Sequence, residues 1–274
     1  MQADVVFLIA LYRNDGEVWA FIRQLSLQSY KDIWVYVVCN AALDVKLFNL
    51  RVKEFGFVTV LFPGKNLGYF GAARFALEHH KSNHSIPELT IVCNSDLKIS
   101  DVNFINGLVE HTGADNVAAI APSVVSSFTG RDMNPYLTER YSRKYLQMLK
   151  SVYSFYPAYV LYETAALVKS KLQDKPKRES RSTETYAVYG ACIAFTKAFF
   201  ERGGKLDFGA FLYGEEIFVA EQAKQLGMTV LHDSRLQIVH EEHSTTGFIK
   251  SPRHVRYLHE SIAFILKAFY DERK

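Results

Sequence analysis

Acidic residues and a histidine at three separate places in the chain are of the types that metal-assisted group transfer requires. Asp96 ends the run Asn94-Ser95-Asp96 after an apolar segment, Glu215 and Glu216 follow Tyr213-Gly214, and His240 ends another apolar segment. One carboxylate can hold a divalent cation, a second can accept a proton, and an imidazole can bind a metal or a phosphate. Sugar transfer from a nucleotide diphosphate needs these groups together.

Each of these residues also has a common structural role. An Asp after a strand often forms a turn, and a Glu at a helix N-terminus is stabilised by the helix dipole. The run from His240 to His243 does not have the His-Glu-x-x-His order of a zinc helix. The chemical interpretation therefore depends on the three places meeting in the folded chain.

Composition indicates a globular protein with a large core. The 274 residues are 49% hydrophobic, which is enough for one α/β domain or a domain with an appended subdomain. A net charge of +3 without a clustered basic face argues against nucleic acid binding. No apolar run approaches the ~20 residues that span a bilayer, and no basic leader precedes the first strand. We expect a cytoplasmic chain in which Cys39, Cys93 and Cys192 are buried as small hydrophobes.

The first 125 residues alternate apolar runs with segments of helical spacing. Strands are expected at Val5–Leu11, Ile33–Cys39, Phe57–Phe62, Leu89–Cys93 and Val117–Ala121, and helices at Glu17–Leu27, Leu43–Glu54, Gly71–His80 and Val102–His111. This alternation predicts an α/β fold with a mainly parallel, helix-covered sheet. Ligands bind beyond the carboxyl ends of strands in such sheets, so the residues directly after each strand are candidates for a site.

The second half has a different pattern. A tyrosine-rich segment from 134 to about 170 is expected to be helical, and the polar segment 171–185 to be a solvated loop or, alternatively, a lid that closes on phosphates. Regular structure resumes over 186–195, followed by a helix at 214–226 and strands at Thr229–Leu231 and Leu236–Val239. A final helix starts at Ser251-Pro252. Its apolar residues are expected to pack on the sheet domain; alternatively it lies on a membrane surface, with Arg253 and Arg256 near anionic headgroups.

A glycine-rich turn runs from Pro63 to Ala73. It lacks the dinucleotide pattern Gly-x-Gly-x-x-Gly and the Lys-Ser/Thr ending of a phosphate loop. Gly68 and Gly71 would let the backbone approach a ligand closely, or would simply permit tight helix packing.

Taken in order, the motifs resemble those of the inverting family 2 glycosyltransferases of the GT-A fold, especially the rhamnosyltransferase-like branch. The resemblance covers residues 4–121 and 186–265 and rests on Leu11-Tyr12-Arg13-Asn14, Val38-Cys39-Asn40-Ala41-Ala42, Asn66-Leu67-Gly68-Tyr69-Phe70-Gly71, Asn94-Ser95-Asp96, Gly190-Ala191-Cys192, Phe211-Leu212-Tyr213-Gly214-Glu215-Glu216 and Ile238-Val239-His240.

The resemblance implies a GT-A catalytic domain over 1–250. Within it, 1–125 would bind the nucleotide, 126–185 would be a helical insertion with a mobile loop, and 186–250 would hold the acceptor and the catalytic group, followed by a C-terminal helix over 251–274. Asp96 and His240 would hold Mg²⁺ or Mn²⁺, and Glu216, with Glu215 beside it, would be catalytic. The implied nucleotide contacts are Leu11, Tyr12, Arg13, Asn40, Asn66, Gly68, Asn94 and Ser95. The implied acceptor and sugar pocket is Tyr189, Gly190, Ala191, Cys192, Tyr213 and His243.

The implied activity is transfer of a sugar from a UDP- or dTDP-sugar to a growing cell-surface glycan such as O-antigen or capsule. The acceptor could be lipid-linked, which leaves open a peripheral contact with the inner face of the membrane. Cys39 replaces an acid of the family pattern and Glu216 replaces an Asp, so a catalytically silent glycan- or nucleotide-binding subunit is an alternative. A sugar-nucleotide pyrophosphorylase is disfavoured, because Tyr12-Arg13-Asn14-Asp15 follows the first strand in place of a glycine-rich loop.

Overall fold

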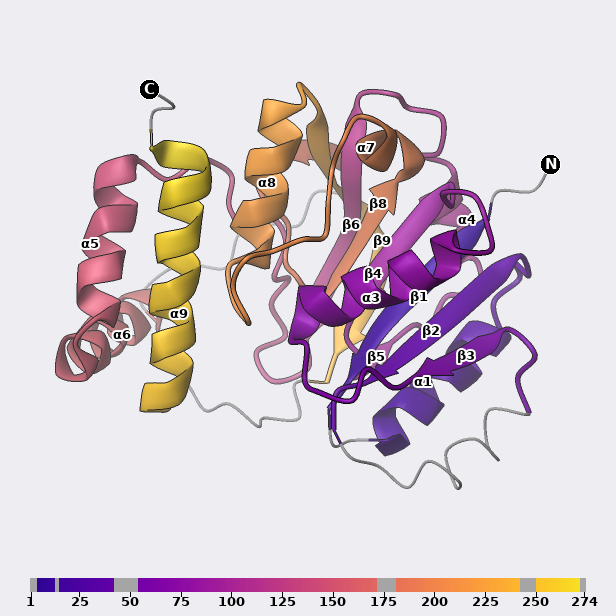
Figure 1. Cartoon of the computed structure of the whole chain (residues 1–274), viewed down its shortest axis with the longest axis horizontal. Helices are drawn as coiled ribbons and strands as arrows, with labels where there is room; N and C mark the ends of the chain where they lie inside the picture. Colours follow the sequence, from indigo (N-terminus) through magenta and orange to yellow (C-terminus); the bar gives the residue numbers. More distant parts are fainter. Residues whose placement is uncertain (1–3, 13–14, 42–53, 172–180, 242–249, 272–274) are drawn as a thin grey trace.

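The computed structural model describes residues 4–12, 15–41, 54–171, 181–241 and 250–271. Within these ranges a nine-stranded sheet has the order β3-β2-β1-β4-β8-β6-β9-β5, and β7 pairs with β9. Figure 1 shows this sheet at the centre of the molecule with helices packed around it. The predicted α/β class is therefore confirmed. The expected helix Leu43–Glu54 falls almost wholly outside the described residues.

The element bounds follow the sequence expectation closely in the first half of the chain. The strands are β1 Val5–Leu11, β2 Ile33–Cys39, β3 Val58–Leu61, β4 Leu89–Cys93, β5 Leu97–Lys98, β6 Val117–Ser126, β7 Ser182–Thr185, β8 Cys192–Thr196 and β9 Thr229–His240. The helices are α1 Asp15–Ser26, α3 Tyr69–Lys81, α4 Phe104–Val109, α5 Arg143–Tyr153, α6 Tyr156–Lys171, α7 Lys197–Glu201, α8 Glu215–Gln225, α9 Pro252–Ile265 and the π-helix η1 Leu266–Tyr270.

Most strands of the sheet point in one direction. Strands β3, β2, β1 and β4 are parallel, and β6 and β9 are parallel to each other. Strand β8 lies between β4 and β6 and is antiparallel to both, so β6 and β9 share the direction of β4. The mainly parallel sheet is thus confirmed for the described chain, with β5, β7 and β8 reversed.

Both faces of the sheet are buried, which explains why the strands read as continuous apolar runs. Phe7 and Ile9 of β1 pack in a core with α1 and α4, which contribute residues such as Phe21 and Phe104. Val6 and Leu8 point to the opposite core, where α3, α7 and α8 pack. The three cysteines are buried and free, as expected.

Three expectations for the second half were wrong in detail. The two strands expected at 229–231 and 236–239 are one strand, β9, whose pairing with β6 shifts register between Pro122 and Ser123. The polar segment 171–185 ends in strand β7, whose backbone pairs with β9 although its side chains are polar and mostly exposed. The helical stretch expected from 134 begins only at Arg143, after the Ser142 hydroxyl accepts a hydrogen bond from the Tyr145 N–H.

Helices α5, α6 and α9 pack side by side at one end of the molecule (Figure 1). Ile262 and Ile265 of α9 are buried in a cluster with Leu146 of α5 and Ile217 of α8. The apolar side of the C-terminal helix is therefore covered by protein, as the packing alternative predicted, although other helices supply much of the contact. No helix in the described ranges has the length and apolar character needed to cross a bilayer.

The far end of α3 carries a buried histidine. The side chain of His80 is inaccessible to solvent, its Nδ1 lies 3.0 Å from the Tyr36 hydroxyl, and its ring stacks on His84 with centroids 4.7 Å apart. Burial, with smaller contributions from His84 and His79, lowers the pKa of His80 to about 4. Asp4, whose pKa burial raises, lies 3.8 Å from the His80 Nε2.

This arrangement predicts sensitivity to acid. Because the folded-state pKa of His80 is below its ordinary value, the stability that it contributes is fully present above pH 6.5 and is lost as the pH falls towards 4. We expect the free energy of unfolding, measured with urea between pH 7.5 and 4.5, to fall by about 2 kcal/mol more for the wild type than for His80→Leu. His79→Leu, at the neighbouring position, is the matched control and should follow the wild-type curve. Parallel curves for the wild type and His80→Leu would contradict the assignment.

Candidate active site

Asp96 and His240 meet because a short strand follows Asp96. Strand β5 pairs antiparallel with the end of β9, with Leu97 opposite His240, and the Glu241 N–H donates to the Asp96 carbonyl at 2.9 Å. The Asp96 Oδ1 consequently lies 3.0 Å from the His240 Nε2. Asn94 Nδ2 is 3.4 Å from the same nitrogen, and Lys98 and Glu241 form an ion pair beside it. The two predicted metal ligands are thus adjacent.

The pair fits a divalent cation. Two ligands that bind one Mg²⁺-sized ion in adjacent octahedral positions lie about 3 Å apart, given metal–ligand bonds of roughly 2.1 Å. The Asp96 side chain is 19% exposed, so the site is open to further ligands. In the part of the chain that the structure describes, no group of three His, Cys, Asp or Glu residues could hold a metal. A cation here would therefore complete its shell with water or bound substrate, as Mg²⁺ commonly does.

The glycine-rich turn is fixed by two asparagines. The Asn40 amide donates to the Gly68 carbonyl at 2.9 Å and accepts from the Leu67 N–H at 3.0 Å, and Asn66 Oδ1 accepts from the Gly68 N–H at 2.9 Å. Gly68 has a φ of 74°, and a Cβ there would lie 2.2 Å from the Phe211 carbonyl oxygen. Asn40 and Asn66 therefore use these amide groups to shape the turn, and Gly68 allows residue 211 to approach it.

The other predicted nucleotide contacts lie at strand ends. The Leu11 side chain is fully buried. The Leu11 carbonyl accepts the Asn40 N–H at 2.9 Å, so Leu11 presents only its backbone at the carboxyl edge of the parallel strands. Tyr12 is 52% exposed, and Asn94 and Ser95 are partly buried after β4. Arg13 lies outside the described residues. Cys39 is buried, and burial raises the pKa of its thiol to about 11.

Helix α8 begins with the two predicted catalytic carboxylates. Tyr213 and Gly214 both have left-handed backbone conformations, with φ values of 70° and 85°, and turn the chain into the helix at Glu215. Glu216 Oε1 accepts the Gly190 N–H at 3.2 Å. A Cβ on residue 190 would lie 2.8 Å from that oxygen, so a glycine there lets the carboxylate reach the backbone.

Burial raises the pKa of both carboxylates. Glu215 is 5% exposed, and its Oε1 has no hydrogen-bond partner among the described residues. Burial, together with the neighbouring charge of Glu216, raises the pKa of Glu215 to about 8. Burial also raises the pKa of Glu216, although backbone N–H groups of Glu216, Gly190 and Gly214 oppose the shift. Glu216 is the more accessible of the two.

Residues 189–192 connect the carboxylates to the metal pair. The Asn94 N–H donates to the Ala191 carbonyl at 2.9 Å, and Cys192 faces Cys93 across β4 and β8. The Tyr189 ring lies 5.9 Å from that of His240, centroid to centroid. The structure therefore brings Asp96, His240, Glu216 and the segment from Tyr189 to Cys192 to one edge of the sheet.

The predicted acceptor residues differ in whether their side chains or only their backbone can face a ligand. The side chains of Ala191 and Cys192 are buried, so these residues present backbone rather than side chain. The Tyr213 ring has the Lys250 Nζ 4.8 Å from its centroid and packs edge-on against His254. His243 is outside the described residues.

Sequence reasoning missed three residues that shape this site. The Tyr69 hydroxyl donates to the Gly190 carbonyl at 2.8 Å, and Asn134 Oδ1 accepts the Tyr189 N–H at 2.7 Å. The Tyr136 ring lies 6.3 Å from the Tyr189 ring. Tyr69 stands within the glycine-rich motif, which could have pointed to it. Asn134 and Tyr136 lie in the predicted insertion, before the start of α5, and nothing in the sequence marks them.

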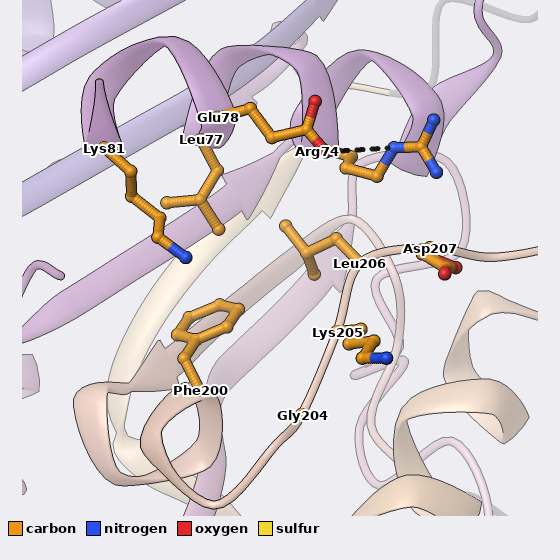
Figure 2. Close-up of a pocket in the computed structure, with 9 residues that line it drawn as sticks. All are labelled: Arg74, Leu77, Glu78, Lys81, Phe200, Gly204, Lys205, Leu206 and Asp207. Carbon is orange, nitrogen blue, oxygen red and sulfur yellow. Dashed lines mark ion pairs between the residues drawn. The ribbon is translucent and has the colours of Figure 1, made fainter.

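A separate groove of about 200 Å³ lies between α3 and the segment after α7. Figure 2 shows Leu77, Phe200 and Leu206 projecting into it, with Lys81 and Lys205 at its rim and Arg74 paired with Glu78 at 3.6 Å. None of the described residues that line this groove is among the predicted site residues. The groove is distinct from the Asp96–His240 edge.

Comparison with solved structures identifies the fold. GalNAc-T7 with UDP, GalNAc and Mn²⁺ matches at a TM-score of 0.66 and 14% identity, over 99% of this chain and 49% of that one. The mannosyltransferase PcManGT from Pyrobaculum calidifontis with GDP-Man and Mn²⁺ matches at a TM-score of 0.60 and 17% identity. The match covers 100% of this chain and 66% of that one. S. aureus TarS residues 1–349 with UDP-GlcNAc match at a TM-score of 0.58 and 11% identity. The match covers 97% of this chain and 67% of that one. The chain therefore has the GT-A fold of these glycosyltransferases and spans about half to two thirds of their chains.

No protein-family profile matches the chain, and no curated protein matches it in sequence. At identities below 20%, the structural matches establish the fold and leave the activity to be argued from the site.

The state of Glu215 predicts a loss of stability in alkali. A carboxyl group whose folded-state pKa is raised contributes stability that is fully present below its ordinary pKa of 4.5 and is lost as the pH rises through about 8. Glu215→Gln removes this titration. We expect the free energy of unfolding of Glu215→Gln, measured in urea, to increase relative to that of the wild type by about 4 kcal/mol between pH 5 and 9.

Glu260→Gln is the matched control, because Glu260 is an exposed carboxylate on α9. It should leave the pH dependence of stability unchanged. If the wild type and Glu215→Gln keep a constant difference from pH 5 to 9, Glu215 is not held in its neutral form.

Proposed function

We propose that this chain is a metal-dependent inverting glycosyltransferase, which transfers a sugar from a UDP- or dTDP-sugar to a hydroxyl group of a growing cell-surface glycan. The observation that carries the proposal is that Asp96 and His240, in contact at 3.0 Å, lie on the same sheet edge as Glu216. The Gly190 N–H holds the Glu216 carboxylate at this edge. Solved relatives of the fold that contain UDP, GDP-Man or UDP-GlcNAc, two of them with Mn²⁺, support a nucleotide-sugar donor.

Asp96 and His240 are the residues that would hold Mg²⁺ or Mn²⁺. A bound cation would neutralise the charge of the donor diphosphate and so favour its departure. In this proposal the nucleotide lies against residues 1–125, beside the glycine-rich turn that Asn40 and Asn66 fix. Residues 186–250 hold the acceptor. Helix α3 begins at Tyr69, within the glycine-rich turn, and the N-terminus of a helix is suited to binding phosphate.

Glu216 is the general base of the proposed reaction. It takes the proton of the acceptor hydroxyl, the acceptor oxygen forms a bond to the anomeric carbon, and the bond from that carbon to the diphosphate breaks. Attack from the face opposite the leaving group inverts the anomeric configuration. The raised pKa of Glu216 makes its carboxylate a better proton acceptor, and the Gly190 N–H fixes its orientation.

The class of glycan, a donor with UDP or dTDP, and any peripheral contact with a membrane follow from the resemblance to family 2 glycosyltransferases. They are part of the same proposal. A screen of UDP-, dTDP- and GDP-sugars by thermal shift, with and without Mn²⁺, identifies the donor, because a ligand that binds the folded state raises the melting temperature by an amount that grows with the logarithm of its concentration relative to Kd.

Replacement of the base tests the catalytic assignment. Glu216→Gln keeps the size of the side chain and removes the proton acceptor, so we expect transfer to fall by about 10²–10⁴-fold. Donor affinity, measured by calorimetry with Mn²⁺, should stay within about threefold of wild type because Glu216 does not contact the metal pair. Full activity in Glu216→Gln would remove the base assignment. Donor binding by the wild type without transfer or hydrolysis would favour the silent-subunit alternative.

Replacement of a metal ligand tests the other half of the site. We expect Asp96→Ala to weaken Mn²⁺-dependent binding of the donor by at least about tenfold in calorimetry, because one of two protein ligands is lost. Asp207→Ala is the control, since Asp207 lines the separate groove on α3. Equal donor affinity of Asp96→Ala with and without Mn²⁺, at the wild-type value, would refute the metal site.

A further inference from the structure

The segment that precedes α5 is fixed against the sheet directly beside the candidate active site. Asp132 Oδ1 accepts the Val124 N–H and the Asn134 N–H, each at 3.0 Å, and its other oxygen accepts the Ser123 hydroxyl. Asn134 is 5% exposed and donates from Nδ2 to the Pro122 carbonyl at 2.7 Å. The backbone around residue 134 is therefore held to β6 by buried hydrogen bonds.

The same segment is bridged to the connection between β7 and β8 that leads to Gly190. Leu137 and Ala187 exchange both backbone hydrogen bonds, at 3.1 and 2.9 Å, and the Tyr189 N–H donates to Asn134. Tyr136 thus stands next to Tyr189, with ring centroids 6.3 Å apart and planes at 34°. The Tyr189 ring in turn lies 5.9 Å from the His240 ring. A row of three rings leads outwards from the metal pair.

Tyr136 is partly exposed and is also closely surrounded by protein. It is 41% exposed, so part of its ring is open to solvent. Surrounding protein nevertheless raises the pKa of its hydroxyl well above the ordinary value, and the nearby charge of Glu216 raises it further. A single exposed tyrosine is common on protein surfaces. This one is held in a fixed position, and it lies beside the proposed base.

We infer that Tyr136 and Tyr189 form an aromatic wall of the acceptor subsite, against which the apolar C–H face of a pyranose ring packs while one of its hydroxyl groups reaches Glu216. The inference rests on the proposed function, and it adds the substrate class of that subsite: a pyranose with one unobstructed C–H face. The side of a sugar ring on which its C–H bonds gather is apolar, and a partly exposed aromatic ring buries such a surface at low entropic cost.

The position of the wall assigns it to the acceptor rather than to the donor nucleotide. A general base must lie within hydrogen-bond reach of the acceptor hydroxyl, so the acceptor ring is adjacent to Glu216. Tyr136 belongs to residues 126–142, outside the ranges that carry the family resemblance. The insertion would thus contribute to substrate recognition as well as to packing.

The test uses binding of simple glycosides, which needs no turnover. Saturation-transfer NMR of the full chain with UDP and Mn²⁺ is recorded with methyl α-L-rhamnopyranoside, methyl β-D-glucopyranoside, methyl β-D-galactopyranoside and methyl α-D-mannopyranoside. The proteins are wild type, Tyr136→Ala, Tyr136→Phe and Phe155→Ala. Phe155, which is 62% exposed and lies between α5 and α6, controls for loss of an exposed aromatic ring elsewhere.

We expect at least one glycoside to bind the wild type through its C–H face, and Tyr136→Ala to weaken that binding by about tenfold. Tyr136→Phe keeps the ring and should stay within about twofold, as should Phe155→Ala. Three outcomes would overturn the inference. Tyr136→Ala could bind the glycosides as the wild type does, Tyr136→Phe could lose as much binding as Tyr136→Ala, or none of the four glycosides could bind the wild type.

Donor hydrolysis separates this inference from the proposed function. Phe155→Ala should hydrolyse the donor with Mn²⁺ at a rate within about twofold of wild type, because Phe155 lies outside the proposed site, between α5 and α6. If the wild type neither binds nor hydrolyses any of the sugar nucleotides, the proposed function fails, whereas the glycoside measurements still decide the aromatic wall. If donor hydrolysis is intact and glycoside binding is insensitive to residue 136, only the wall fails.

Discussion

The backbone pairing of β5 with the end of β9 is the constraint on which the candidate site depends. It places Leu97 opposite His240. Asp96 directly precedes Leu97, so its carboxylate meets the His240 imidazole. The reversed direction of β8 is the second requirement. Since β8 is antiparallel to β4, its first residue rather than its last lies at the carboxyl edge of the parallel strands. Gly190 and Ala191, which precede it, therefore reach the same edge as Asn94 and can hold Glu216 there.

Much of the first half of the fold could be predicted because its strands are buried on both faces and read as unbroken apolar runs. Asp96 and His240 could be selected for the same reason, since each stands at the end of such a run. Strand β5 has two residues and β7 is polar throughout, so neither has a periodic pattern to detect. The direction of β8 depends on packing between β4 and β6, which lie far from it in sequence. Asn40 and Asn66 are predicted nucleotide contacts, and the structure adds that their amides bond to the glycine-rich turn, a role that only coordinates can reveal.

Three glutamates of α8 show how strongly local surroundings decide the behaviour of one residue type. Burial tends to raise the pKa of Glu221 too, but hydrogen bonds from Arg140 and Tyr186 outweigh it, and the pKa is lowered. Arg140 donates two hydrogen bonds to Glu221, at 2.7 and 2.9 Å, and the Tyr186 hydroxyl donates a third at 2.6 Å. Within the described ranges neither Glu215 nor Glu216 is paired with such a cation, and their pKa values are raised. The paired carboxylate thus fixes the helix in place, while the unpaired ones at its start keep the ability to exchange a proton.

The contacts of Arg140 extend to η1. Its guanidinium lies 3.8 Å from the centroid of the Tyr270 ring and donates to the Phe269 carbonyl at 3.3 Å, so α8 and η1 share one cation. On the ribosome, residues 266–270 emerge long after the strands that carry Asp96 and Asn94 have been made. Helix α8 can be synthesised and can begin to pack before then, but its tie to Arg140 is incomplete until η1 arrives. The full set of contacts that Arg140 makes with α8 and η1 can therefore form only after the strands beside Asp96 and Asn94 have been synthesised.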